Sequence, residues 1–186
     1  MKFSIVTTTI NIPFVLEKYM QNFQKFGWKK VFFIIAGDKK TPSSIVEFCK
    51  ELQSKFGYEI EYLNVEKQEK LAPTLGEYIP YNSIARRNFA MLYAYKQGAD
   101  IIITIDDDNH VESNDFLKGH SHVGKNVKMK CIKTKTGWYN VCEILKEERN
   151  IYFFPRGFPI NQRSYSFDVE IYVKKNKVVV NEGLWI

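Results

Sequence analysis

The chain has 186 residues, of which 45% are hydrophobic and 26% charged, and its formal net charge is +6. This length and composition are those of an ordinary globular domain with a substantial core. The longest apolar run, Val31–Ala36, is too short to cross a membrane, and the first ten residues lack the unbroken apolar core of a signal peptide. We therefore expect a cytoplasmic protein without a membrane span. The three cysteines are widely spaced and form no C-x-x-C pair, which argues against a disulfide framework and a zinc site.

Strand-like and helix-like segments alternate along the first half of the chain. Apolar, β-branched runs predict strands, and helix-period apolar positions bounded by Asn, Pro or Gly predict helices. The predicted strands are Lys2–Ile10, Lys30–Gly37, Tyr58–Leu63 and Asp100–Ile105. The predicted helices are Asn11–Gly27, Thr41–Gly57 and Asn82–Gln97, and Asn64–Gly76 is predicted to be a polar loop. This alternation predicts an α/β fold with a mainly parallel sheet flanked by helices on both faces.

The pattern changes after Asp115. The second half predicts short strands, turns at 135–137 and 175–177, and one short helix around Glu143–Arg149. The segment Gly124–Gly137 is dense in lysine, and we interpret it as a solvated hairpin rather than a nucleic-acid patch. Because no linker or repeat interrupts the sequence, we predict one domain over 1–186 with a more irregular, mixed C-terminal half.

Three consecutive aspartates, Asp106, Asp107 and Asp108, directly follow the apolar run of the last predicted strand. Adjacent carboxylates repel one another, so a helix N-terminus, an arginine or a metal ion is needed to compensate them. Alternate side chains of an extended strand share a face, which lets Asp106 and Asp108 hold a hard divalent cation such as Mg²⁺ or Mn²⁺. The alternative is that Asp108 or Asn109 caps a following helix while the others are solvated.

Two arginines precede the aspartates along the chain. Arg86 and Arg87 lie in the first two turns of a predicted helix, where the helix dipole disfavours cations. An anionic ligand nearby would account for them, because arginine suits phosphate recognition. A surface salt bridge with Glu77 is the alternative. Since ligands of parallel α/β sheets bind outside the carboxyl ends of the strands, we expect the aspartates and the loops after the first two strands to share one edge.

Four segments of the chain resemble a known family. They are VTTTINIP (residues 6–13), GWKKVFFIIAGDKKTP (27–42), the run from Ile79 to Asn109, and FFPRGFPI (153–160). Together they are similar to STELLO-type proteins and to the related reversibly glycosylated polypeptides, the UDP-arabinopyranose mutases. In RGFPINQR, Arg156 and Arg163 keep the spacing of the arginine pair in the mutases, and the final NEGLWI matches the Gly-Leu-Trp segment that follows it.

The resemblance implies a GT-A-like (Rossmann-like) nucleotide-sugar fold and a set of site residues. Asp106 and Asp108 would bind Mn²⁺ or Mg²⁺, and Arg156 and Arg163 would be catalytic. The residues implied to contact the nucleotide sugar are Thr7, Thr8, Thr9, Asp38 and Asp107, and we expect Arg86 and Arg87, from their place in the helix, to join them. The alternative is that the threonines are ordinary strand residues and Asp38 forms a turn. The implied activity is a metal-dependent glycosyltransferase with a nucleotide-sugar donor, expected to be a UDP-sugar, and an unknown sugar acceptor.

Other functions stay open beside the transferase. One is a UDP-sugar mutase that reversibly glycosylates its own arginine, with Arg156 favoured as the acceptor. A second, from another class, is a non-catalytic nucleotide-sugar-binding or regulatory module, and a third is a Mg²⁺-dependent phosphohydrolase. Chains of the resembling families continue past Gly-Leu-Trp, whereas this one stops at Ile186, so either a minimal version or a shortened chain is expected. No nucleic-acid partner is expected, and an oligomer is compatible with the sequence.

Overall fold

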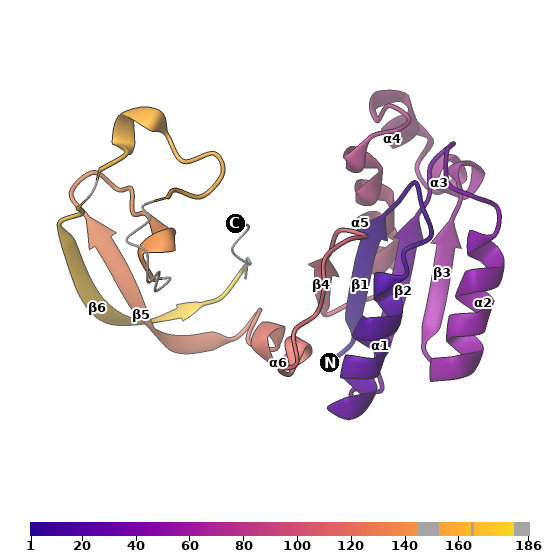
Figure 1. Ribbon diagram of the computed structural model, residues 1–186, viewed down its shortest axis with the longest axis horizontal. Coiled ribbons are helices and arrows are strands. Elements are labelled where there is room, and N and C mark those ends of the chain that lie inside the picture. Colours follow the sequence, from indigo (N-terminus) through magenta and orange to yellow (C-terminus); the bar gives the residue numbers. More distant parts are fainter. Residues whose placement is uncertain (145–152, 165, 181–186) are drawn as a thin grey trace. The chain divides into compact units, whose positions relative to one another are not determined.

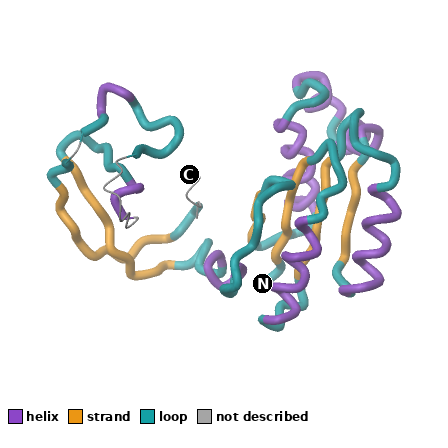
Figure 2. The backbone as a smooth tube through the Cα atoms, viewed as in Figure 1, coloured by secondary structure: helices purple, strands orange, loops and turns teal. Residues whose placement is uncertain are grey.

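The computed structural model describes residues 1–144, 153–164 and 166–180 (Figures 1 and 2). The chain divides into two compact units, Met1–Ser121 and His122–Ile186, and each is described by itself. The boundary falls close to Asp115, where the sequence pattern changes. No described helix is long and apolar enough to cross a membrane.

The first unit is built on a four-stranded parallel sheet. Its strands are β1 (Phe3–Thr8), β2 (Val31–Ala36), β3 (Glu59–Leu63) and β4 (Ile101–Thr104), in the order β3-β2-β1-β4. All three pairings are parallel. The predicted mainly parallel α/β architecture is thereby confirmed, and it is compatible with a Rossmann-like fold.

Helices cover both faces of this sheet, as Figure 1 shows. Helices α1 (Val15–Lys25) and α2 (Ile45–Phe56) lie on one face, where Phe23 of α1 stacks on Phe33 of β2 with ring centroids 5.8 Å apart. Helix α5 (Arg87–Lys96) lies on the other face, where Ala90 and Ala94 pack against Val6 and Ile34. Odd and even residues of β2 therefore face opposite layers, which explains why all six of its residues are apolar and buried.

The predicted polar loop at Asn64–Gly76 is wrong. This segment forms helix α3 (Val65–Leu71) and helix α4 (Pro73–Tyr78). The Asn64 side chain caps α3 by accepting a hydrogen bond from Lys67 N–H at 2.8 Å, and Pro73 occupies the first turn of α4. Cap and proline thus start two short helices in a segment that the apolar pattern alone does not mark.

Two predicted helix starts also differ. Asn11 is not a cap, because α1 begins at Val15 and Asn11 N–H donates to the Thr9 hydroxyl. The helix predicted from Asn82 begins as a short 3₁₀ turn, η1 (Ile84–Arg86), which leads into α5. Helix α2 ends as predicted at Gly57, which adopts the left-handed conformation that glycine favours (φ +73°).

The segment after β4 leads to helix α6 (Phe116–His120), the last helix of the first unit. Asp115 caps α6 by accepting from Lys118 N–H, and it also accepts from the Trp28 indole N–H at 2.8 Å. Phe116 packs edge-on against Tyr19 of α1, with ring centroids 5.1 Å apart. No helix follows the aspartates directly, so the alternative in which Asp108 or Asn109 is a helix cap is not observed.

The second unit contains a two-stranded antiparallel sheet. Strand β5 (Asn126–Thr134) pairs with β6 (Val169–Lys177) over nine consecutive positions. The lysine-dense segment therefore pairs with a distant strand instead of forming a hairpin of its own, and the turn predicted at 175–177 is wrong because these residues end β6. Short 3₁₀ turns occur at η2 (Val141–Ile144) and η3 (Ile160–Gln162). Most of the helix predicted at Glu143–Arg149 lies outside the described residues.

Candidate functional site

A pocket of about 400 Å³ opens at the carboxyl ends of the strands in the first unit. Its lining comes from the loops after β1, β2 and β4 and from the turn before α5. The lining residues are Thr8, Thr9, Ile10, Asn11, Asp38, Asn82, Ser83, Ile84, Arg87, Asp106, Asp107 and Asp108. The prediction that these loops open on one edge of the sheet is confirmed.

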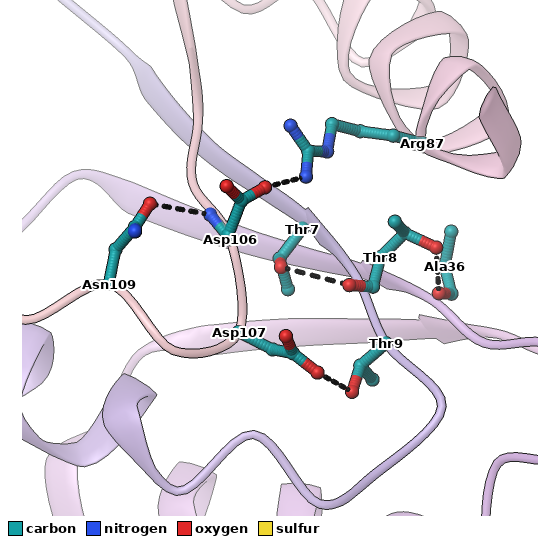
Figure 3. A network of polar contacts seen from close by, with 8 residues as sticks. All are labelled: Thr7, Thr8, Thr9, Ala36, Arg87, Asp106, Asp107 and Asn109. Atoms are coloured by element: carbon teal, nitrogen blue, oxygen red, sulfur yellow. Dashed lines mark hydrogen bonds and ion pairs between the residues drawn. The ribbon is translucent and has the colours of Figure 1, made fainter. Parts of the chain in front are cut away.

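Asp106 and Asp107 point to different partners (Figure 3). Asp106 pairs with the Arg87 guanidinium, whereas Asp107 contacts the Thr9 hydroxyl. Asp108 is exposed on the turn. The Asn109 side chain accepts a hydrogen bond from Asp106 N–H at 3.0 Å and holds this turn in shape. Each of the three adjacent carboxylates thus has a different environment, which lowers the repulsion between them.

Arg87 is the positively charged partner of Asp106. Its side chain is only 17% exposed, and that of Asp106 is 33% exposed, so the pair is partly shielded from water. The Arg87 Nε is buried and has no hydrogen-bond partner among the described residues. The alternative, a salt bridge of either arginine with Glu77, is not found among the described ion pairs, which instead include the pair of Arg87 with Asp106.

The charge of Asp106 also acts on the core beneath it. Burial raises the pKa of the Tyr19 phenol to about 12, and the nearby Asp106 carboxylate adds to this rise. The phenol therefore stays protonated through the physiological range.

Arg86 is buried within the first unit and supports the pocket wall. Its side chain is 0% exposed and lies between the rings of Tyr81 and Phe89, each 4.9 Å from the guanidinium carbon. Its Nε donates to Gln68 Oε1 at 2.7 Å, while Nη1 and Nη2 have no hydrogen-bond partner among the described residues. Arg86 does not line the pocket.

Gln68 connects Arg86 to the ends of two strands. Its Nε2 donates to Gly37 O and to Leu63 O, both at 2.7 Å, and the side chain is fully buried. A single amide thus joins the carboxyl ends of β2 and β3 to the turn that carries Arg86 and Arg87. No local signal in the sequence indicates this role, because a glutamine within a polar stretch is expected to be exposed on the surface.

The loops that form the pocket are tied to each other by two further side chains. The Thr41 hydroxyl accepts from Asp38 N–H and donates to Thr9 O, both at 2.7 Å. The Asp38 carboxylate accepts from Lys39 N–H at 2.7 Å and from Ser83 N–H at 3.3 Å. Asp38 therefore holds the turn before α5 against the end of β2.

The other predicted site residues fall into two groups. Thr8 and Thr9 line the pocket, whereas Thr7 is 1% exposed inside β1 and does not. Arg156 and Arg163 belong to the second unit, where both are exposed and Arg163 lies over the Phe154 ring at 5.3 Å. Their catalytic role stays a prediction.

Sequence reasoning missed several lining residues. Ile10, Asn11, Asn82, Ser83 and Ile84 all contribute to the pocket. Asn82 has φ +53°, a left-handed conformation that asparagine adopts more readily than most residues. The Pro-Tyr-Asn-Ser run is the local signal for a turn at this point, and the helical segment begins after it, at Ile84, instead of at Asn82.

The charges that line the pocket do not balance. Four carboxylates and one guanidinium give a formal charge of −3. Among the described residues, no group of three His, Cys, Asp or Glu side chains is arranged to hold a metal ion. Asp106 and Asp108 still offer hard carboxylate oxygens of the kind that Mg²⁺ and Mn²⁺ prefer. Two carboxylates leave the rest of a coordination shell to other ligands.

No protein-family model matches the sequence, and no curated protein matches it significantly. The resemblance to STELLO-type proteins and UDP-arabinopyranose mutases therefore stays a prediction.

Proposed function

We propose that this protein is a metal-dependent glycosyltransferase with a GT-A-like fold that uses a nucleotide-sugar donor, with UDP as the nucleotide. The observation that carries the proposal is the pocket at the carboxyl edge of the parallel sheet, where Asp106–Asp108 and Arg87 meet the threonine loop after β1. Ligands of such sheets bind at this edge. The sequence resemblance supplies the substrate class.

The charge of the pocket supports a requirement for metal. A lining with a formal charge of −3 repels a free diphosphate, so an anionic nucleotide needs a cation to enter. Asp106 and Asp108 would hold Mn²⁺ or Mg²⁺ together with the diphosphate oxygens of the donor. A cation bound there offsets the charge of the departing diphosphate as the glycosidic bond breaks.

The residues of the chain have distinct parts in this proposal. Arg87 binds a diphosphate oxygen while it keeps Asp106 in place, because a guanidinium offers several donors in a fixed fork. Asp107, held by Thr9, keeps the turn closed. Ile10 and Ile84 line the same pocket with exposed aliphatic side chains and offer apolar surface to a uracil ring.

A thermal-shift panel tests the proposal. UDP, UDP-sugars, ADP and CMP are each added with and without Mn²⁺. We expect UDP ligands to raise the melting temperature by several degrees only with the metal, because a ligand at about 100 times its Kd stabilises by roughly 2.7 kcal/mol. No shift with any nucleotide, or the same shift without metal, contradicts the proposal.

A turnover assay distinguishes an enzyme from a non-catalytic binding module. Release of UDP from a UDP-sugar in the presence of Mn²⁺ supports a transferase or mutase, whereas binding without release supports the non-catalytic module. Hydrolysis of a simple phosphate ester supports the phosphohydrolase instead.

A further inference from the structure

The β5–β6 sheet presents one face that carries only positive and aliphatic side chains along most of its length. Directly opposed residues of an antiparallel pair point to the same side, and alternate residues share a face. In β5, residues 128, 130 and 132 are exposed, whereas Val127, Met129 and Cys131 between them are partly buried. On β5 the even-numbered residues therefore form the more exposed side, which we call the outward face, whereas β6 is exposed on both sides.

Lysines occupy one end of this outward face. Lys128 is directly opposite Lys175, and Lys130 and Lys177 stand next to this pair on the same side. All four are exposed. Like charges directly opposed across two strands are unfavourable, so the arrangement is not explained by the stability of the sheet.

Branched aliphatic side chains occupy the other end. Ile132 is opposite Ile171, and Val173 and Val169 lie beside them along β6. Ile171 is 64% exposed and Val173 is 56% exposed. No acidic residue lies on this face, since Glu170 is on the opposite side together with Lys133, its partner in the register.

We propose that this face docks on a membrane surface that contains anionic lipids. Lysines beside aliphatic side chains suit the bilayer interface, because the ammonium groups reach the headgroups while the aliphatic groups enter the acyl boundary. A single-stranded nucleic acid favours arginine and aromatic stacking platforms, and the face has neither, since Tyr172 lies on its other side. A second copy adds four more lysines and no acidic residue, so it offsets none of the positive charge of this face. The inference is independent of the proposed enzymatic function.

Vesicle co-sedimentation of the full chain tests the proposal. Vesicles of phosphatidylcholine alone are compared with vesicles that also contain phosphatidylserine, at low and high salt. We expect binding only with the anionic lipid, and weaker binding at high salt. Lys128→Thr/Lys175→Thr is expected to lower the partition coefficient by roughly thirtyfold, since each lysine near such a surface contributes about fivefold.

Lys133→Thr/Lys174→Thr is the matched control, because it removes the same charge from the same strands on the opposite face. It is expected to bind nearly as the parent does. Ile171→Thr/Val173→Thr keeps the β-branched shape and is expected to weaken binding at both salt concentrations. If this double variant fails to fold, the nearly isosteric Val173→Thr alone provides the measurement.

Five outcomes overturn the proposal. The first four are no binding to anionic vesicles, equal losses of binding in the two lysine double variants, no effect of the aliphatic substitutions, and dimerisation that disappears in Lys128→Thr/Lys175→Thr. Binding to poly(U) in place of vesicles, with the same dependence on Lys128 and Lys175, also overturns it and assigns the face to nucleic acid.

Discussion

Replacing Gln68 by methionine is expected to destabilise the first unit strongly. Methionine has nearly the same length and shape, so the change leaves little cavity, but it removes three hydrogen bonds of 2.7 Å at once. Leu63 O keeps a second donor, the Gly37 N–H at 3.0 Å. Gly37 O and Arg86 Nε lose their partner, and the Arg86 guanidinium is already without a partner at its other two nitrogens.

The expected magnitude follows from these two groups. Loss of a hydrogen bond to a charged group costs about 1.5–3 kcal/mol, and a buried carbonyl left unsatisfied costs about 1–3 kcal/mol. Together they predict a loss of roughly 2.5–6 kcal/mol in the free energy of unfolding. This is a large part of the 5–15 kcal/mol that is typical of a whole domain.

Urea denaturation followed by circular dichroism measures this loss. The control is Gln53→Met, the same substitution on the exposed side of α2, for which a change within about 0.5 kcal/mol is expected. The double variant Gln68→Met/Arg86→Met removes both partners and should be less destabilised than the sum of the single variants by about 1.5–3 kcal/mol. A stability of Gln68→Met within 0.5 kcal/mol of the parent refutes the reasoning.

Three further predictions concern the pocket, the second unit and the core. Arg87→Gln leaves the neighbouring carboxylates uncompensated and should weaken UDP binding with Mn²⁺ by about tenfold or more in calorimetry; an unchanged affinity excludes Arg87 from the site. If the protein is a mutase, the intact mass after incubation with UDP-sugar and Mn²⁺ increases by the mass of one sugar, and Arg156→Lys removes this increase. Full activity of both Arg156→Lys and Arg163→Lys excludes the two arginines from catalysis. Because the pKa of Tyr19 is raised from near 10 to about 12, its contribution to stability is complete below pH 10 and is lost as the pH rises through 12. Tyr19→Phe should therefore flatten the alkaline loss of stability in urea denaturation, and an unchanged pH slope counts against this.

The sheet of the first unit was predictable because its signals are local. Runs such as Val31–Ala36 are apolar and β-branched, and glycines close the helices that separate them. Parallel strands joined in this way bring their carboxyl ends to one edge, so the meeting of the threonine loop, Asp38 and Asp106–Asp108 could be foreseen.

The contacts that organise the pocket were not predictable from the same signals. The burial of Gln68 depends on Gly37 and Arg86, which lie 31 and 18 residues away along the chain. The sequence suggests an anionic ligand or Glu77 as the partner of Arg87, whereas the structure pairs it with Asp106. The sequence does not indicate the partner of β5, because β6 begins 35 residues after Thr134, beyond the reach of local turn signals. Tertiary pairing, which decides each of these cases, leaves no periodic pattern in the chain.

The metal-dependent nucleotide pocket is tested most directly by calorimetry of UDP in the presence of Mn²⁺ with the variant Asp106→Asn/Asp108→Asn. The control Glu47→Gln/Glu51→Gln removes two exposed carboxylates from α2 and changes the net charge by the same amount. We expect the parent and the control to bind UDP only with Mn²⁺, and the aspartate variant to remain folded without measurable metal-dependent binding. Binding of Mn²⁺ and UDP by Asp106→Asn/Asp108→Asn as tightly as by the parent would contradict the account.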